Sequence, residues 1–263
     1  MIRVITIILL CIFCIITETA ETKAFQINGG VEKQSIFKMN TVSDKASGNA
    51  VENAQISIPS NDFVTSSDET GKFEMPKNIS PPYILTVKKA GYQPFSLTVR
   101  SYGKVPLNIE ISKNSANKIT ISEDSYHLGD NSFSSSSANA SDFKMKSVGI
   151  FYQKNFFVKK LGFGEDVNLV IGSIIGVDTK EAKTLGQTNV IDAYSSPVKI
   201  FFNSKEIASI KVNGDNQKIA IPRSLIRQNA ENSVKIFSGI NMTQFLYTDY
   251  DDFEFTNLFL EYR

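Results

Sequence analysis

Apolar and polar residues alternate with a period of two through much of this chain, and this pattern constrains the fold more than any other feature. Residues 54–59 read Ala-Gln-Ile-Ser-Ile-Pro, so alternate side chains are apolar until a proline ends the run. Successive side chains of a β-strand point to opposite faces of a sheet, and the pattern therefore indicates a half-buried strand. Because the alternation recurs in both halves of the chain, we expect an all-β protein.

The first half of the chain is predicted to form a small β-sandwich without a helix of useful length. Asp68 and Gly71 are residue types that a tight turn needs, and Phe73 and Met75 begin the alternation after it. An opening strand is placed at residues 35–39 or their neighbours. The remaining strand-like segments lie in residues 81–94, 95–99 and 105–111.

Four short motifs in this half follow one another in a specific order. They are Ala54-x-Ile56-x-Ile58, Thr70-Gly71-Lys72-Phe73, Tyr83-x-Leu85-x-Val87 and Gly91-Tyr92-x-Pro94. The set resembles the carboxypeptidase regulatory-like module, a transthyretin-type β-sandwich, over about one third of the chain. The resemblance implies an accessory role beside other domains rather than catalysis. Tyr92 and Pro94 are expected to pack at a corner between strands.

The second half carries seven or eight further strand-like segments separated by turn signals, which favours a β-sandwich of the jelly-roll kind. A single helical turn is expected within residues 224–229. The strand-like segments are residues 119–121, 147–152, 167–175, 198–202, 207–212, 218–221, 234–237 and 253–262.

Three stretches of this half carry a second resemblance. Residues 202–207 suit a strand, a turn and a strand, residues 221–226 precede a strand at 232–236, and residues 251–261 contain the closing sequence Asp-Asp-Phe-Glu. Their order is similar to that of a galactose-binding-like jelly roll of the carbohydrate-binding kind. The resemblance implies a glycan ligand, and tyrosine or phenylalanine would have to stack on it because the chain has no tryptophan.

The N-terminus has the order of a secretory signal. A short basic start precedes an apolar run at residues 4–16 and a polar tail, and cleavage after Ala24 or Ala20 is expected. The run is too short to cross a bilayer. It contains Cys11 and Cys14, the only cysteines of the chain, so the mature protein would suit an oxidising compartment, secreted or periplasmic.

Three regions are therefore predicted: a signal peptide at residues 1–24, the regulatory-like sandwich at 25–113 and the jelly roll at 117–263. The 28 basic and 27 acidic residues are scattered and give a net charge of +1. Nucleic acid is consequently not an expected partner. No stable membrane span is expected once the signal has been removed.

Catalytic motifs are absent from the sequence. His127 is the only histidine, which excludes a zinc site built on two histidines, and no Gly-x-Ser-x-Gly elbow supplies a nucleophile for a triad. Gly162 and Gly164 do not continue into a phosphate-binding loop. A small glycan hydrolase with paired carboxylates remains an alternative, because the sequence does not give the distance between two carboxylates.

The segment around His127 has two interpretations. In the first, Tyr126, His127, Asp130 and Asn131 belong to a loop rim that holds a polar ligand. In the second, Gly129 and Asp130 form a plain turn that leaves His127 exposed.

Four carboxylates, those of Asp249, Asp251, Asp252 and Glu254, fall within six residues at the start of the closing strand. Calcium takes six to eight oxygen ligands, so one interpretation is a structural calcium ion. Alternation places Asp252 and Glu254 on the face opposite Phe253, and the other interpretation is a solvated acidic edge that discourages aggregation.

The sequence thus predicts a secreted or periplasmic binding protein without catalytic activity, which recognises a carbohydrate or another surface polymer. The alternative is a structural or assembly protein of the cell envelope that binds protein partners through exposed sheet edges. A small glycan hydrolase is the third hypothesis.

Overall fold

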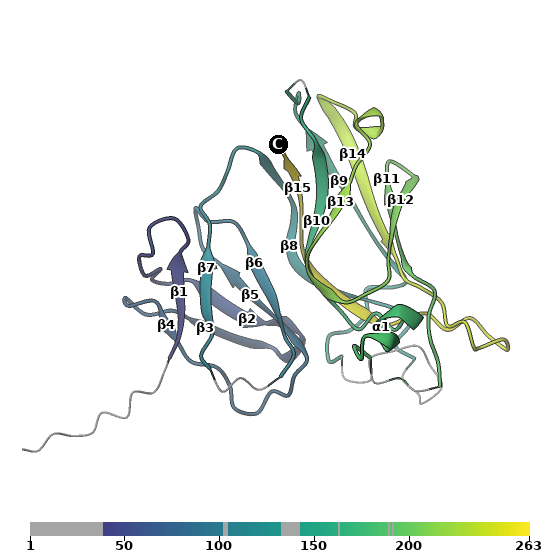
Figure 1. Cartoon of the computed structure of the whole chain (residues 1–263), viewed down its shortest axis with the longest axis horizontal. Coiled ribbons are helices and arrows are strands. Elements are labelled where there is room, and N and C mark those ends of the chain that lie inside the picture. Colours follow the sequence, from purple (N-terminus) through teal and green to yellow (C-terminus); the bar gives the residue numbers. More distant parts are fainter. Residues whose placement is uncertain (1–38, 102–104, 133–142, 163, 189, 191) are drawn as a thin grey trace, which may run out of the picture. The chain divides into compact units, whose positions relative to one another are not determined.

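The computed structural model of this protein describes residues 39–101, 105–132, 143–162, 164–188, 190 and 192–263. Lys38–Arg263 form one compact unit, and the predicted signal peptide lies outside the described residues. Nearly all regular structure in the unit is β-strand (Figure 1), as predicted. None of the helices in the described part of the chain is long and apolar enough to span a bilayer.

Two sheets make up the first half of the unit. The smaller sheet has the strand order β4-β1-β7, and the larger sheet is antiparallel with the order β3-β2-β5-β6. β1 runs parallel to β7, so the first and last strands of this half pair with each other. The strands are β1 (Asn40–Asp44), β2 (Gln55–Ile58), β3 (Phe63–Ser66), β4 (Lys72–Phe73), β5 (Tyr83–Lys88), β6 (Phe95–Val99) and β7 (Asn108–Ile111).

Apolar side chains of both sheets meet in one core, and the alternation seen in the sequence sets which side chains enter it. Ile56 and Ile58 of β2 are fully buried, as are Leu85 and Val87 of the central strand β5. Tyr92 is partly buried against the same core, which confirms its predicted packing role.

The turn before β4 forms as its residue types predict. Asp68 Oδ1 accepts hydrogen bonds from the backbone N–H groups of Thr70 at 2.8 Å and Lys72 at 2.9 Å. Gly71 has φ +76°, and a Cβ atom there would lie 2.5 Å from the Val42 carbonyl oxygen. Only glycine fits this left-handed position beside β1 without displacing backbone.

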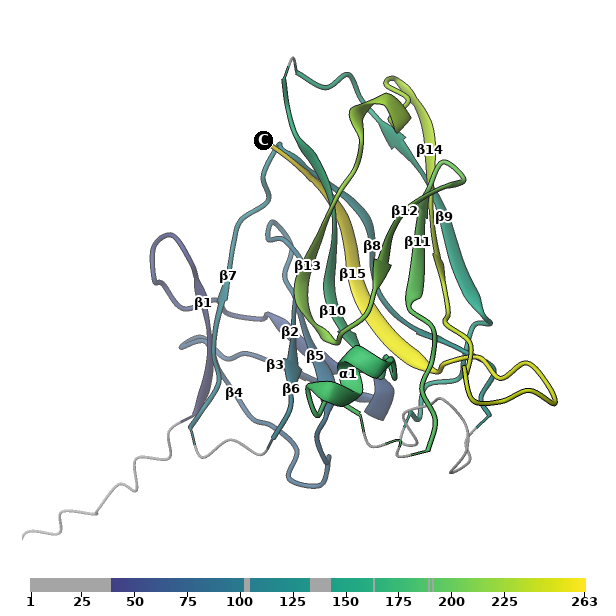
Figure 2. The same cartoon turned by 45° about the vertical axis from the view of Figure 1, so that its right-hand side comes forward.

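The second half is a jelly-roll β-sandwich of eight antiparallel strands in two four-stranded sheets. Their orders are β13-β10-β15-β8 and β12-β11-β14-β9 (Figure 2). The strands are β8 (Lys118–Leu128), β9 (Phe151–Val158), β10 (Val167–Ile175), β11 (Val198–Phe202), β12 (Lys205–Ile210), β13 (Gly214–Ala220), β14 (Ala230–Phe237) and β15 (Phe253–Tyr262).

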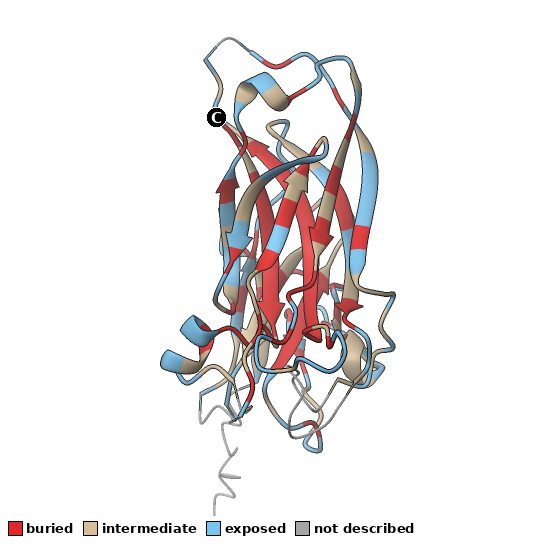
Figure 3. Ribbon diagram, turned by 90° about the vertical axis from the view of Figure 1, so that its right-hand side faces the viewer, coloured by how far each residue is buried: buried red, intermediate tan, exposed pale blue. Residues whose placement is uncertain are grey.

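The core of this sandwich lies between its sheets, where Phe253 and Phe255 of β15 join Phe202 of β11 in one apolar cluster. Figure 3 shows buried residues along the strands in the middle of the view, and exposed residues in the connecting loops and on strands at the sides. β15 lies inside its sheet between β10 and β8, and every residue from Phe253 to Glu261 is buried. Both faces of this strand are therefore covered.

Hydrogen bonds join β6 of the first sandwich to the second sandwich. Ser173 Oγ of β10 donates to Ser96 Oγ of β6 at 3.0 Å, and both side chains are buried. The Thr98 backbone N–H of β6 donates to Asp215 Oδ1 of β13 at 3.0 Å. β6 thus lies against the sheet that contains β10, β13 and β15.

Several elements differ from their prediction. The opening strand is Asn40–Asp44, just after the predicted segment, and Phe63–Ser66 forms a strand that was not predicted. β9 begins at Phe151, later than expected. A short helix, α1 (Lys180–Thr184), was also missed; it is capped by Thr179, whose Oγ1 accepts from the Ala182 N–H at 3.1 Å. The predicted helical turn is the 3₁₀ turn Arg223–Leu225.

Candidate functional site

One end of the second sandwich gathers buried polar side chains from distant parts of the sequence. β8 and β10 end there, and β15 begins there. His127 lies near the end of β8, Asp178 lies three residues beyond β10, and Asp251, Asp252 and Glu254 surround the start of β15. All five side chains are buried. We call these five residues the buried polar cluster.

His127 and Asp252 form a buried pair within this cluster. His127 Nε2 lies 2.8 Å from Asp252 Oδ1, and both side chains have 0% solvent exposure. The other ring nitrogen faces the Met145 carbonyl oxygen, which only accepts, so Nδ1 is the donor. The Asn131 N–H also donates to Asp252 Oδ1, at 3.1 Å. When Asp252 is ionised, Nε2 donates to it and the imidazole ring carries a proton on both nitrogens.

The pKa values of this pair reflect burial and mutual contact. Burial acts to lower the pKa of His127, but the hydrogen bonds to Asp252 and to the Met145 carbonyl outweigh it and raise the pKa above its ordinary value. Burial raises the pKa of Asp252, against the lowering effect of His127 and of the Asn131 N–H. The two side chains thus form a hydrogen bond in a place that water does not reach.

Gly129 permits the close approach of β8 to Asp252. Its φ is +142°, and a Cβ atom there would lie 2.1 Å from Asp252 Oδ1 and 2.7 Å from Asp252 Cα. No other residue type fits without moving this backbone. The predicted turn at Gly129 is thus also the place where two chain segments meet.

Asp251 lies next to Asp178 in the same cluster. Asp251 Oδ2 accepts from Ser195 Oγ at 2.6 Å and from the Asp178 backbone N–H at 3.2 Å. Burial raises the pKa of Asp251 well above its ordinary value, and the negative charge of Asp178 adds to the rise. Burial also raises the pKa of Asp178 to about 7 and the pKa of Glu254 to about 7. Both carboxyls are therefore partly protonated near neutral pH.

The interpretation of the acidic run as a solvated edge is wrong. Asp249, Asp251, Asp252 and Glu254 are all buried. Asp252 and Glu254 do point away from the apolar cluster that contains Phe253, but that second face of β15 is covered as well. The interpretation of His127 as an exposed turn residue is wrong for the same reason.

The predicted calcium ligands contact different protein donors. Asp249 Oδ2 accepts from Asn241 Nδ2 at 2.7 Å, while Asp251 and Asp252 accept from Ser195 and His127. Across the described residues, no three or more histidine, cysteine, aspartate or glutamate side chains are grouped as metal ligands. The calcium site therefore stays a prediction.

The four residues predicted to hold a polar ligand are divided between two environments. Tyr126 packs in the sandwich, with its ring centroid 4.3 Å from that of Tyr152, while His127 and Asn131 contact Asp252. Asp130 is exposed, and its Oδ2 accepts from the Tyr250 N–H at 2.9 Å. Neighbouring positions of a strand face opposite ways, which separates Tyr126 from His127. Their role in ligand binding stays a prediction.

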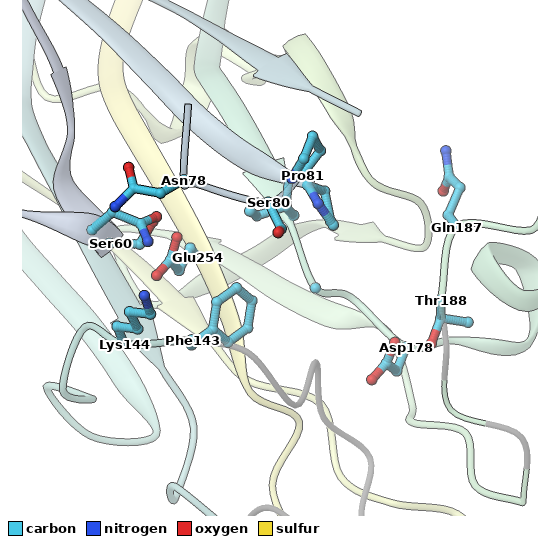
Figure 4. A pocket seen from close by; sticks show the side chains of 14 residues that line it. Ser60, Asn78, Ser80, Pro81, Phe143, Lys144, Asp178, Gln187, Thr188 and Glu254 are labelled. Carbon is cyan, nitrogen blue, oxygen red and sulfur yellow. The ribbon is translucent and has the colours of Figure 1, made fainter. Parts of the chain in front are cut away.

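A cavity of about 540 Å³ lies beside the buried polar cluster (Figure 4). Asp178 and Glu254 form part of its wall, next to Ile175 and Gly176 at the end of β10. Phe143 packs against this wall, since a Cβ atom on Gly176 would lie 2.3 Å from its ring. Other parts of the lining include Ser60, Asn61, Asn78, Ser80 and Lys144.

Two carboxylate oxygens at this cavity have no hydrogen-bond partner among the described residues. They are Asp178 Oδ2 and Glu254 Oε1, on side chains whose residues are 1% and 2% exposed. A buried polar atom without a partner costs about 1–3 kcal/mol, and more when it is charged.

Sequence reasoning missed Asp178 and the part of the lining that comes from the first sandwich. Asp178 belongs to no motif, and its one signal is its place just beyond the long apolar strand 167–175. Ser60 and Asn78 lie in loops whose residue types indicate only turns. Nothing in their spacing connects them to Glu254.

Comparison with known proteins identifies the first sandwich. Residues 41–123 match the family described as the CarboxypepD_reg-like domain. The match covers β1 to β7 and the beginning of β8, and it confirms the predicted regulatory-like resemblance for this part of the chain. No curated protein matches the chain. The predicted galactose-binding-like character of the second sandwich stays a prediction.

Proposed function

We propose that this protein is a secreted or periplasmic binding protein that holds a carbohydrate in the cavity beside Glu254 and Asp178. In this proposal the second sandwich is of the galactose-binding-like kind and supplies the carboxylates. The CarboxypepD_reg-like domain acts as an accessory unit, and its loops contribute polar groups to the same cavity.

The observation that carries the proposal is the chemistry of the cavity wall. Its volume of about 540 Å³ lies within the usual range for small-ligand sites, roughly 300–1,000 Å³. Asn78 offers an amide donor and acceptor, Ser60 offers a hydroxyl, and Asp178 and Glu254 belong to the same lining. Sugar hydroxyls both donate and accept, so one sugar ring can satisfy several of these groups at once.

The aromatic side chain at the cavity suits the same class of ligand. Phe143 lines the cavity and contacts the His127 ring, with the two centroids 5.0 Å apart. Aromatic faces stack on apolar faces of sugar rings, and the chain has no tryptophan for that purpose. Phe143 therefore takes the place of the missing platform in this proposal.

Glycan-array screening of the purified protein, followed by calorimetry with the best ligand, tests the proposal. Replacement of Asn78 by alanine is expected to weaken binding several-fold, because one direct hydrogen bond contributes about 0.5–1.5 kcal/mol. Asn155→Ala, at an exposed position of β9 outside the cavity, is the matched control. Absence of glycan binding, or equal binding by Asn78→Ala, would contradict the proposal. Turnover of the glycan that disappears in Glu254→Gln would instead indicate the hydrolase alternative.

A second candidate function, docking of a protein partner in the cell envelope, is supported by the loop between β14 and β15. Phe245 and Leu246 in this loop are 90% and 93% exposed, and Met242 and Tyr247 are exposed beside them. Adjacent exposed apolar side chains often mark interaction sites. Co-purification of an envelope protein that is lost in the double variant Phe245→Ser, Leu246→Ser, but kept in Asn78→Ala, would favour this function.

A further inference from the structure

We propose that the loop between β14 and β15 inserts its tip into a lipid bilayer and so holds the protein reversibly on a membrane surface. The loop consists of residues 240–248, and Phe245 and Leu246 are at its tip. Membrane attachment by this loop goes beyond carbohydrate binding in the cavity and does not depend on it. A lipid surface, rather than a protein, is then the partner of the loop.

Exposed apolar side chains are concentrated in this loop. Phe245 and Leu246 are 90% and 93% exposed, which exceeds every other large apolar side chain of the described residues. Five of the twelve exposed large apolar side chains in this part of the chain belong to the loop, and the other three of them are Ile240, Met242 and Tyr247. In Figure 1 and Figure 2 the loop extends away from both sheets of the second sandwich. The tip is therefore presented to whatever surrounds the protein.

Hydrogen bonds hold the base of the loop. The Asn241 N–H donates to the Asp249 carbonyl oxygen at 2.8 Å, and Asn241 Nδ2 donates to Asp249 Oδ2 at 2.7 Å, so the two legs of the loop are joined. The Met242 N–H donates to the Tyr194 carbonyl oxygen at 2.8 Å, which joins the loop to the segment before β11. A loop fixed in this way loses little conformational freedom when it meets its partner.

Polar groups of the loop bond to one another. Asn241 Oδ1 accepts from the Thr243 N–H at 2.9 Å and from Thr243 Oγ1 at 2.7 Å. Gln244 Oε1 accepts from the Leu246 N–H at 3.0 Å. A backbone polar group without a partner is strongly disfavoured in hydrocarbon. These internal bonds therefore reduce the cost of moving the tip out of water.

The composition of the loop fits a bilayer better than a protein. Residues 238–248 contain no charged side chain, and Asp249, which follows them, is 1% exposed. A charged side chain opposes entry into a bilayer, whereas protein interfaces are often anchored by tryptophan, tyrosine or arginine. Tyr247, next to the tip, combines an apolar ring with a polar hydroxyl and is of a type enriched at the level of lipid head groups.

Insertion of two side chains provides weak attachment. Burial of one phenylalanine or leucine side chain favours the apolar phase by about tenfold or more. Phe245 and Leu246 together should therefore increase partition to a bilayer about a hundredfold. The attachment is reversible, like that given by a single acyl chain.

Co-sedimentation with phosphatidylcholine vesicles tests the proposal, with protein that lacks the predicted signal peptide because its apolar run could bind lipid itself. The double variant Phe245→Ser, Leu246→Ser is expected to lower partition about a hundredfold. Val64→Ser, at a 57% exposed position of β3, is the matched control and should bind like wild type. Since the loop is uncharged, high salt and added anionic lipid should change wild-type binding less than about twofold.

A tryptophan at the tip reports insertion directly, because the chain has no other tryptophan. Vesicles are expected to shift the emission of Leu246→Trp to shorter wavelength, and brominated lipids are expected to quench it. Val64→Trp, on β3, is the control and should show neither effect. Circular dichroism and thermal melting establish that each variant is folded.

The other partners of the loop correspond to different outcomes. Vesicle binding that is absent in wild type, or equal in the double serine variant, overturns the proposal. An envelope protein that co-purifies with wild type but not with this variant, without vesicle binding, assigns the loop to a protein. A dimer that the variant converts to a monomer, again without vesicle binding, assigns it to a second copy of the chain. Glycan binding should be equal in wild type and variant, so the two proposals fail independently.

Discussion

His127 Nε2 and Asp252 Oδ1 lie 2.8 Å apart, and neither side chain is accessible to solvent. His127 belongs to β8, and Asp252 directly precedes β15. These two strands pair along most of their length. The contact therefore joins the end of β8 to the start of β15, within the buried polar cluster. Removal of either partner would leave the other buried and unsatisfied.

Replacement of His127 by alanine is expected to lower the free energy of unfolding by about 3–5 kcal/mol, because the Asp252 carboxylate then loses its buried partner. Urea denaturation monitored by circular dichroism measures the change. Lys199→Ala is the control, since Lys199 and Glu206 form an exposed ion pair at 3.3 Å of a kind that contributes about 0–1 kcal/mol. Equal effects of the two substitutions would contradict the structural role of the buried pair.

The stability of the protein is expected to depend on the charge of Glu254. Burial raises the pKa of this carboxyl from 4.5 to about 7. The folded state thus binds the proton more tightly than the unfolded chain, so this stabilising contribution is complete below about pH 4.5 and is lost as the pH rises through about 7.

Glu254→Gln removes this titration. Wild type is expected to lose about 3 kcal/mol of this contribution to its free energy of unfolding between pH 4 and pH 8, whereas the variant does not. The variant's free energy of unfolding relative to wild type should therefore increase by that amount over this pH range. Denaturant titrations of both proteins at the two pH values give the difference directly. Glu231→Gln, at an exposed position of β14, is the matched control. A difference for Glu254→Gln that does not vary with pH would contradict the prediction.

Replacement of Gly129 by alanine is expected to destabilise the protein by at least about 3 kcal/mol. The new methyl group would lie 2.1 Å from Asp252 Oδ1 and 2.7 Å from Asp252 Cα, so backbone must move as well as side chain. Gly48→Ala is the control, because Gly48 also has a positive φ but nothing within 4 Å of a Cβ atom. Its expected cost is about 1 kcal/mol, and thermal melting of both variants separates the close contact from backbone strain.

The exposed loop between β14 and β15 is expected to contribute little to stability. Phe245 and Leu246 are 90% and 93% exposed, so the double serine variant should change the free energy of unfolding by less than about 0.5 kcal/mol. The same variant should elute earlier from a hydrophobic-interaction column, because it loses two exposed apolar side chains. Marked destabilisation would show that the loop packs against the protein.

The strands of the second sandwich were largely predictable because each carries a local signal of burial. Residues 253–262 and 167–175 were placed as the structure has them, and the turn residues between the strands follow from their conformational preferences. Phe63–Ser66 was missed since its Val64 side chain is exposed and the alternation is short. Local patterns thus located most strands without fixing their partners.

The candidate site depends on contacts that no local pattern encodes. Alternation placed Asp252 and Glu254 correctly on the face opposite Phe253, but it did not reveal that this face is covered. Glu254 meets Asp178 because β10 and β15 pair with Ile175 opposite Glu254. Register between distant strands follows from the packing of the whole sandwich, and one sequence does not specify it.

The position of β15 has a consequence for the order in which the protein is assembled during synthesis. β15 follows all other described strands in the sequence, yet it lies between β10 and β8 in its sheet. Until Tyr262 has left the ribosome, β8 and β10 keep unpaired edges that attract other chains. The second sandwich therefore closes only after β15 has been made, and until then the edges of β8 and β10 that β15 will cover are open to pairing with other chains.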